Sequence, residues 1–319
     1  MIKVGDKIGN IDVIEQISDA GWYADVFKAK DNSANNVIAI KVLKKISDEE
    51  RKRFERENHI LHTLKPHENI ILPLSEVLNH ADNIYYLLEL ADFNLEKYLL
   101  ANSDPNICEL LDIFIQICNG LKYAHSKRIV HRDLHKGNIL LKENGNNRKV
   151  KLSDFGLGKD FKFCLETVTT SYIPLRAITI AAPEVLSQIV NKDSTFESDA
   201  LADIFSLGII FHCIFNRLSV LYATRIIELK EKGQELGIYL KGTAHDKRKK
   251  FHNYVMQTFD LYELKKYFCV LIEGVDEKIN GKINSLISLM TEPEFKKRIS
   301  SLDNIIQEVI TIKNEIANV

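Results

Sequence analysis

The segment 129–140 (IVHRDLHKGNIL) restricts the fold and the chemistry of this chain more than any other part of the sequence. Asp133 and Asn138 lie five positions apart in it, ahead of two short apolar runs with a turn signal between them. A carboxylate and an amide on one loop in front of a hairpin could hold a nucleophile and a metal ion side by side. Sixteen residues after Asn138, a strand-like run leads into Asp154-Phe155-Gly156. These polar loop residues are the candidate site.

The first third of the chain is predicted to form a small β-sheet with one helix. Apolar residues alternate through residues 11 to 43, with a polar turn at 31–36, and this pattern is typical of strands. Residues 48 to 64 change to a helical period, with their apolar residues on one side. Two further apolar segments, Ile70–Leu74 and Ile84–Leu90, are expected to complete a lobe of about five strands.

The remainder of the chain is predicted to be mainly helical. Residues 113–124 fit an amphipathic helix, and residues 201–215 fit a buried one. Between them, the short runs Ile139–Leu141 and Val150–Leu152 flank Asn144-Gly145, a strong signal for a hairpin turn. We therefore expect an α+β fold with two lobes: a small antiparallel sheet with one key helix, and a larger helical lobe. A junction between two such lobes is a favoured place for a ligand site.

Length and composition agree with this arrangement and exclude several classes of protein. The chain has 319 residues, of which 45% are hydrophobic and 27% charged, so it can bury a sizeable core and is not a disordered sequence. This length allows two domains or one large fold with two lobes. The 43 basic and 44 acidic side chains give a net charge of −1. Such a balanced chain is not expected to bind nucleic acid or an anionic membrane through its overall field.

Targeting and cysteine patterns favour a cytoplasmic protein. No secretory signal is predicted at residues 1–11, and the longest apolar stretch, Leu207–Phe215, is far too short to span a bilayer. The five cysteines are widely spaced and include no C-x-x-C pair. This spacing favours buried free thiols over a disulfide framework or a zinc site. We expect no attachment to a membrane.

Four motifs in order resemble the signature set of the eukaryotic-type protein kinases of the Ser/Thr class. They are Ile38-Ala39-Ile40-Lys41, the H-R-D-L-x-x-x-N run from His131 to Asn138, Asp154-Phe155-Gly156 and Ala182-Pro183-Glu184. The resemblance extends from about Val13 to about Ile310. It implies a single protein kinase domain over residues 1–319, with an N-lobe at about 1–88, a hinge at about 89–93 and a C-lobe at about 94–319.

The resemblance assigns roles in phosphoryl transfer from ATP, with Mg²⁺ as the metal cofactor. Lys41 would pair with the α- and β-phosphates and would be held by an ion pair with Glu57. Asp154 and Asn138 would bind Mg²⁺, which prefers oxygen ligands. Asp133 would accept the proton of the substrate hydroxyl and orient its oxygen. Such chemistry depends on positioning and on neutralisation of charge.

The resemblance also implies where the adenine ring of ATP binds. The ring would be enclosed by apolar side chains from both lobes and would form hydrogen bonds with the hinge backbone. The residues concerned are Val26 and Ala39 above the ring, Leu140 below it, and the backbone of Glu89-Leu90-Ala91 at its edge.

Three further residues are implied to support the site. His131 would pack beneath Phe155, and Asp203 would brace the backbone of the loop that carries Asp133. Arg298 would pair with Glu184. These roles are structural.

Three of the places where the sequence departs from the family bear on the phosphate and substrate sites. Of the three glycines that the family carries in its phosphate loop, only Gly21 is retained, although backbone N–H groups must approach the phosphates closely there. His135 replaces the lysine that Ser/Thr kinases carry two residues after the Asp of the H-R-D motif, and the arginine typical of tyrosine kinases is absent nearby. Ala177 replaces the threonine expected five residues before Ala182.

Arg132, which precedes Asp133, resembles the arginine of kinases that are switched on by phosphorylation of the activation segment. We expect autophosphorylation in this segment, with self-association of two chains if the reaction occurs in trans. The candidate acceptors are Thr167, Thr169, Thr170, Ser171 and Tyr172.

The expected function is an ATP-dependent protein kinase that phosphorylates Ser or Thr hydroxyls of a protein substrate. Two alternatives stay open: a pseudokinase or scaffold that binds nucleotide weakly, which the eroded glycine loop favours, and a small-molecule kinase on the same fold. The first alternative conflicts with the presence of Lys41, Glu57, Asp133, Asn138 and Asp154. The second conflicts with the A-P-E motif and its arginine.

Overall fold

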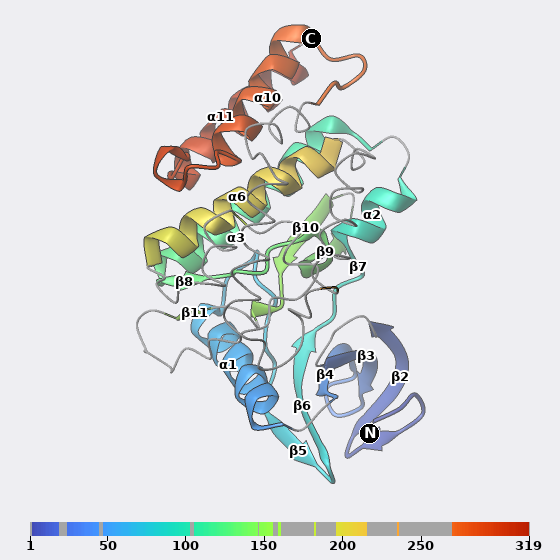
Figure 1. The fold of residues 1–319 in the computed structure, drawn as a ribbon. Helices are drawn as coiled ribbons and strands as arrows, with labels where there is room; N and C mark the ends of the chain where they lie inside the picture. Colours follow the sequence, from blue (N-terminus) through green and yellow to red (C-terminus); the bar gives the residue numbers. More distant parts are fainter. Residues whose placement is uncertain are drawn as a thin grey trace.

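The computed structural model describes most of the chain. The described residues are 2–18, 24–44, 47–102, 105–145, 147–155, 159–160, 182, 196–215, 235 and 270–318. Within them, a sheet with one helix forms the N-terminal lobe, and helices dominate the C-terminal lobe (Figure 1). The structure thus confirms the predicted α+β fold with two lobes.

An antiparallel sheet of six strands makes up the N-terminal lobe, in the order β1-β2-β3-β4-β6-β5. The strands are β1 (Lys7–Ile8), β2 (Ile11–Ser18), β3 (Ala24–Asp31), β4 (Asn36–Leu43), β5 (Leu78–His80) and β6 (Asn83–Glu89). Strands β2, β3 and β4 confirm the prediction from the alternating residues 11 to 43, and β6 matches the second of the two later apolar segments.

Strand β4 is buried on both faces, which explains its nearly continuous apolar sequence. Ile38 and Ile40 belong to one apolar cluster of the sheet, whereas Ala39 and Leu43 belong to the main core, which continues into the helical lobe. Side chains alternate along a strand, so Lys41 lies on the same face as Ala39. This lysine therefore faces the side on which the two lobes meet.

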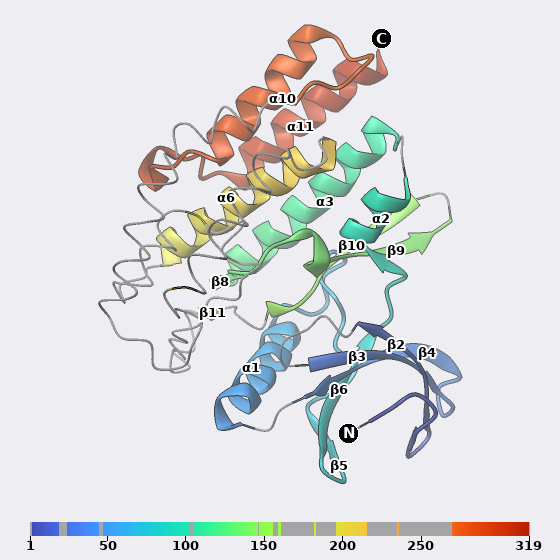
Figure 2. The same cartoon turned by 45° about the vertical axis from the view of Figure 1, so that its right-hand side comes forward.

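Helix α1 (Asp48–Leu64) lies beside the sheet, at the side that faces the helical lobe (Figures 1 and 2). Ser47 caps it, because its side chain accepts a hydrogen bond from the backbone N–H of Glu50 at 3.3 Å. Three acidic residues in the first turn interact favourably with the positive end of the helix dipole. The buried side of the helix carries the predicted apolar residues together with one charged residue, Glu57.

The prediction of a strand at Ile70–Leu74 is wrong. This segment forms only isolated bridges, from Ile70 to Leu152 and from Pro73 to Leu88. Its backbone groups bond in turn to Leu152, in strand β10 (Asn147–Leu152) of the helical lobe, and to β6 of the sheet, and Pro73 has no N–H to donate. The short strands β1 and β5 were not predicted; all three residues of β5 are exposed, so it lacks an apolar pattern.

Five helices form the described part of the C-terminal lobe. They are α2 (Leu95–Ala101), α3 (Ile107–Ser126), α6 (Phe196–Phe215), α10 (Glu277–Met290) and α11 (Leu302–Ala317), with a short turn η4 (Phe295–Lys297) before the last. Helices α3 and α6 confirm the two helices predicted at 113–124 and 201–215. Within the described part of the chain, no helix has the length and apolarity needed to cross a bilayer.

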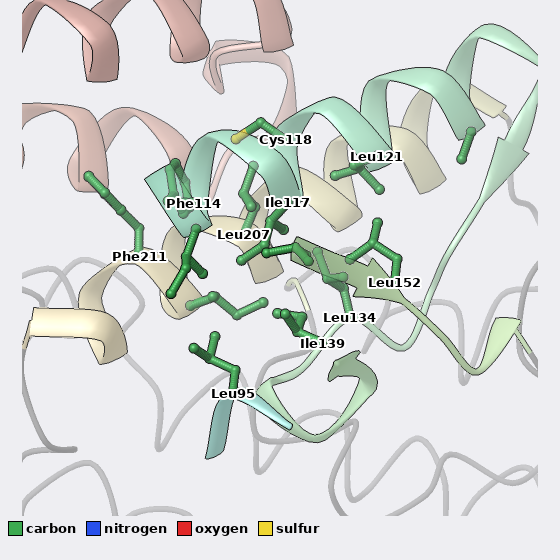
Figure 3. Packing of buried hydrophobic residues seen from close by; sticks show 14 of the residues in the cluster. Leu95, Phe114, Ile117, Cys118, Leu121, Leu134, Ile139, Leu152, Leu207 and Phe211 are labelled. Carbon is green, nitrogen blue, oxygen red and sulfur yellow. The ribbon is translucent and has the colours of Figure 1, made fainter. Parts of the chain in front are cut away.

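The core of this lobe is packed around α3. Figure 3 shows Phe114, Ile117 and Leu121 of α3 among apolar residues from α6 and from the strands below. The rings of Phe114 and Phe211 are 4.1 Å apart between centroids, which joins α3 to α6. Because this core is continuous with the underside of the sheet, it fixes the elements that carry the polar loop.

Short strands hold both ends of residues 131–138, here called the loop 131–138. Strand β8 (Ile129–Val130) precedes it and pairs with β11 (Lys159–Asp160), and the turn η1 (Lys136–Asn138) closes it. Strands β9 (Ile139–Asn144) and β10 (Asn147–Leu152) then form the predicted hairpin, which β7 (Phe93–Asn94) extends. Gly145 has a φ of +61° in the hairpin turn, a conformation that favours glycine.

Candidate active site

A buried ion pair joins the sheet to α1. Lys41 Nζ lies 2.6 Å and 2.8 Å from the two carboxylate oxygens of Glu57, and both side chains are almost completely buried. Asp154 Oδ1 lies 3.5 Å from the same nitrogen. Burial by itself would lower the pKa of Lys41, but the charges of Asp154 and Glu57 outweigh it and raise the pKa above its usual value. Lys41 is therefore a permanent cation in a site shielded from water.

Asp203 of α6 fixes the backbone of the loop 131–138, as the resemblance implied. Its carboxylate oxygens accept hydrogen bonds from the backbone N–H groups of His131 and Arg132, each at 2.8 Å. His125 Nε2 lies 2.9 Å from the same carboxylate. Burial by itself would raise the pKa of Asp203, but the interactions with His125 and with the loop lower it. Arg132 has a φ of +64°, a strained conformation that the two hydrogen bonds help to hold.

Asp133 lies in a setting that disfavours its charged form. The residue as a whole is partly buried, but its Oδ1 is sealed from solvent and makes no hydrogen bond within the described part of the chain. Burial, and next the negative charge of Asp154, raise the pKa of Asp133 to about 7. A carboxyl group with a pKa near neutrality is suited to accept a proton at physiological pH.

Asn138 and Asp154 carry oxygen atoms suited to Mg²⁺. Asn138 Nδ2 donates to the backbone carbonyl of Asp133 at 2.9 Å, which leaves Oδ1 as the amide atom for a cation. The backbone carbonyl of Asn138 accepts from the N–H of Ser153 at 2.9 Å, so Asn138 is tied to the residue next to Asp154. A carboxylate and an amide oxygen are hard ligands, and these residues therefore fit the ion.

His131 is a packing residue in this structure. Its ring centroid lies 4.5 Å from that of Phe155, and both side chains are fully buried. Nδ1 accepts a hydrogen bond from the backbone N–H of Asp133 at 3.3 Å, so Nε2 carries the proton and donates to the carbonyl of Ser153 at 3.1 Å. Burial lowers the pKa of His131. A neutral imidazole with both nitrogens engaged is not placed to act as a base.

His135 folds back onto its own loop. Its Nδ1 accepts a hydrogen bond from the backbone N–H of Gly137 at 3.0 Å. A Cβ at Gly137 would lie 2.8 Å from Cε1 of the imidazole, so the glycine makes room for the ring. The histidine thus shapes the turn η1, a contribution that the missing lysine would not have made.

The residues predicted to enclose adenine come from strands of both lobes. Val26 pairs with Lys41, and Ala39 pairs with Leu88, so all four lie on the same face of the sheet. Leu140 lies on β9 and is partly buried against the main core. Gly21 lies outside the described residues.

Glu89 has an additional role that the sequence did not indicate. Its Oε1 lies 2.7 Å from Lys151 Nζ and accepts from the backbone N–H of Leu72 at 2.9 Å, while Oε2 lies 3.2 Å from Lys142 Nζ. Burial by itself would raise the pKa of Glu89, but the bonds from Lys151 and its neighbours lower it. The side chain thus ties the end of β6 to the hairpin of the other lobe, next to Ala91.

The sequence motifs also did not identify Arg53 and Arg56, two arginines of α1 that lie near the site. Burial, and next the positive charges of Arg53 and Arg132, lower the pKa of Arg56. Three guanidinium groups from α1 and the loop 131–138 therefore share one region. Arg53 precedes Arg56 by three residues and Glu57 by four on the same helix, and side chains at these spacings are neighbours on a helix surface, so the spacing indicated that they would lie together.

Several predicted features lie outside the described residues. They are Gly156, Pro183, Glu184, the acceptors from Thr167 to Tyr172, and Ala177. Arg298, expected to pair with Glu184, donates from Nε to the carbonyl of Glu292 at 2.9 Å and from a terminal nitrogen to the carbonyl of Leu201 at 2.7 Å.

A comparison with sequence models of protein families gives one match, to the model described as protein kinase domain. The match runs from residue 14 to residue 310 and so includes every residue of the candidate site.

Proposed function

Because the chain belongs to the protein kinase domain family, we propose that it is an ATP-dependent protein kinase that transfers the γ-phosphate to Ser or Thr hydroxyls of proteins. The observation that carries this proposal is the buried pair of Lys41 and Glu57 beside Asp154, since a dry, fixed cation is what phosphates require. The loop 131–138 brings Asp133 to the same site.

Each polar residue has a distinct part in the proposed reaction. Lys41 binds the α- and β-phosphates, and Glu57 holds the lysine in place. Asn138 and Asp154 hold Mg²⁺, which when bound supplies positive charge to the phosphate oxygens. Asp133 orients the substrate hydroxyl and accepts its proton, for which its pKa of about 7 is suitable.

We further propose that residues 1–319 form a single kinase domain with an N-lobe at about 1–88, a hinge at about 89–93 and a C-lobe at about 94–319. In the hinge, backbone groups of Glu89 and Ala91 bind the adenine edge, with Val26 and Ala39 above the ring and Leu140 below it. Gly21 contributes a backbone N–H to the phosphates. Free thiols at Cys108, Cys118 and Cys213 support a cytoplasmic location.

The test is transfer of radiolabel from γ-labelled ATP to a generic basic protein and to the chain itself, followed by phosphoamino acid analysis. We expect phosphoserine and phosphothreonine in the wild-type reaction. Asp133→Asn should reduce the rate by a factor on the order of 10³, because it removes the proton acceptor. Asp82→Asn, the same change at an exposed residue, is the matched control and should leave the rate unchanged.

Other outcomes would identify another function. Nucleotide binding without any labelling would indicate a pseudokinase, which the loss of phosphate-loop glycines favours. Turnover of a small metabolite without protein labelling would indicate a small-molecule kinase. Phosphotyrosine as the main product would contradict the Ser/Thr assignment, and full activity of Asp133→Asn would contradict the role of that residue.

We also propose that the kinase is activated by autophosphorylation, in trans between two copies of the chain. The support is that the charges of Arg53 and Arg132 act on Arg56, so a phosphate group near these arginines would add charge-assisted hydrogen bonds beside the contact of Arg132 with Asp199 at 3.8 Å. Phosphopeptide mapping after incubation with ATP and Mg²⁺ should find phosphate among residues 167–172. An active enzyme that carries no phosphate there would contradict the proposal.

A further inference from the structure

Tyr86 is a fully buried tyrosine on β6, and it faces the candidate active site. It is the register partner of Lys41, so the two side chains lie on the same face of the sheet. Its ring packs against Phe54 of α1, with 4.7 Å between centroids and 52° between planes. Phe54 precedes Glu57 by one helical turn. Tyr86 therefore contacts the helix that carries the partner of Lys41.

The hydroxyl group of Tyr86 is poorly accommodated in the core. Oη is shielded from solvent and makes no hydrogen bond of ordinary geometry within the described part of the chain. A buried hydroxyl without a partner costs free energy, and phenylalanine would fill the same space without this cost. The hydroxyl is thus a feature that the packing of the core does not explain.

The groups around this hydroxyl suggest its partner. Burial, and next the charges of Glu57 and Asp154, raise the pKa of Tyr86 well above its usual value. Glu57 is the carboxylate that acts most strongly on the Tyr86 hydroxyl, and a phenol is a good donor to a carboxylate. Both oxygens of Glu57 accept hydrogen bonds from Lys41. A lysine that turns towards phosphates gives up part of this interaction.

We propose that Tyr86 is a positioning residue, whose hydroxyl donates a hydrogen bond to Glu57 when Lys41 turns towards a bound nucleotide. The hydrogen bond replaces part of what Glu57 loses and keeps α1 in place against the sheet. This inference rests on the proposed function, because it requires that Lys41 binds phosphates. It concerns a residue outside the motifs by which the site was found.

The test compares Tyr86→Phe with Tyr85→Phe. Tyr85 is the preceding residue on β6, is also buried, and faces the other apolar cluster of the sheet, so it is a matched control. Affinity for ATP with Mg²⁺ is measured by calorimetry, thermal stability is measured without nucleotide, and kcat and KM are measured with a protein substrate. For Tyr86→Phe we expect about tenfold weaker nucleotide affinity, since a hydrogen bond to a charged group contributes a factor of this size.

The stability measurement separates positioning from general packing. Tyr86→Phe should leave the melting temperature of the nucleotide-free protein unchanged or raised, because it removes an unsatisfied hydroxyl. In a Glu57→Gln background, Tyr86→Phe should have much less effect on affinity, because the charged acceptor is gone. Tyr85→Phe should retain the wild-type affinity for ATP.

Three results would overturn the inference. They are wild-type affinity in Tyr86→Phe, a loss of melting temperature that accounts for the loss of affinity, and the same loss of affinity in the Glu57→Gln background. None of these three results affects the proposed function, because each concerns Tyr86 and leaves nucleotide binding by the wild-type protein intact. A wild-type protein that binds no nucleotide would overturn the proposed function and this inference together.

Discussion

The environment of the Asp133 carboxyl group lowers the stability of the folded protein but suits this residue to accept a proton. Its Oδ1 is buried without a hydrogen bond in the described part of the chain, and the charge of Asp154 acts on it. Both effects destabilise the charged form that a proton acceptor needs. The folded protein is therefore less stable at neutral pH than it would be with an uncharged group at this position.

We predict that Asp133→Asn stabilises the nucleotide-free protein while it removes phosphoryl transfer. The pKa is 3.8 for an ordinary aspartate and about 7 in the fold, so between these values the folded state binds more protons than the unfolded chain. Wild-type stability therefore falls as pH rises through this range. The advantage of the variant should be absent below about pH 4, grow until about pH 7 and then stay constant, at a few kcal/mol.

Urea unfolding of both proteins at several pH values would measure this difference. Asp303→Asn, at an exposed residue of α11 that pairs with Lys122 on the surface, serves as a control and should not stabilise the protein at neutral pH. A difference between Asp133→Asn and wild type that is independent of pH would contradict the prediction.

For single residues, the sequence predicted which residue types form the site but not their burial, hydrogen bonds or pKa values. Lys41, Asp133 and Asn138 stand at motif positions, so their presence near one another followed from the resemblance. The pKa of Asp133 depends on the burial of one oxygen and on its neighbour Asp154, which only the fold brings together. Tyr86 resembles an ordinary apolar strand residue in the sequence, because only the fold shows that the charges of Glu57 and Asp154 act on its hydroxyl.

Among the elements, those with a regular period were predictable and those that connect the lobes were not. Strands β2 to β4 and helix α1 follow local patterns. Residues 69–73 bond to Leu152 on one side and to Glu89 on the other, partners that lie far away in the sequence. Local periodicity contains no information about such partners. The same holds for the contacts of the Glu89 side chain with Lys142 and Lys151.

We predict that Lys151→Met destabilises the protein more than Lys142→Met does. Lys151 lies 2.7 Å from Glu89 with 12% of its side chain exposed, whereas Lys142 lies at 3.2 Å with 44% exposed. Loss of the buried partner should cost about 1–3 kcal/mol, and loss of the exposed partner less than about 1 kcal/mol. Urea unfolding at neutral pH would show this order.

The pH dependence of the same two variants gives an independent check. The fold lowers the pKa of Glu89 below 4.5, so its ionic contribution is present above that pH and is lost as pH falls through the folded pKa. The difference between Lys151→Met and wild type should therefore shrink in acid. Equal losses in the two variants at neutral pH would contradict the assignment of Lys151 as the main partner.

At the scale of the whole molecule, α6 connects the site to the C-terminal helices. It carries Asp203 to the loop 131–138 and Phe211 to α3, and its Gly208 lies against the end of α10. A Cβ at Gly208 would lie 2.8 Å from Met290 Cβ and from Thr291 Cγ2. Met290 Cβ is attached directly to the backbone, so it cannot move without a shift of the helix.

We predict that Gly208→Ala destabilises the protein by about 1–3 kcal/mol, because the added methyl group overpacks the contact between α6 and α10. Gly281→Ala on α10 is the matched control, since a Cβ there meets nothing within 4 Å. It should stabilise the protein by about 0.5–1 kcal/mol through the higher helix propensity of alanine. The opposite signs of these two changes are measurable by urea unfolding.

The packing of α6 should also affect activity, because α6 carries Asp203, which holds the loop 131–138. A shift of α6 away from α10 moves Asp203, which holds the backbone of His131 and Arg132 at 2.8 Å, so Gly208→Ala should also slow phosphoryl transfer under conditions where the variant is fully folded. Gly281→Ala should transfer phosphate at the wild-type rate. If Gly208→Ala is as stable and as active as Gly281→Ala, then the packing of α6 on α10 does not position the loop 131–138.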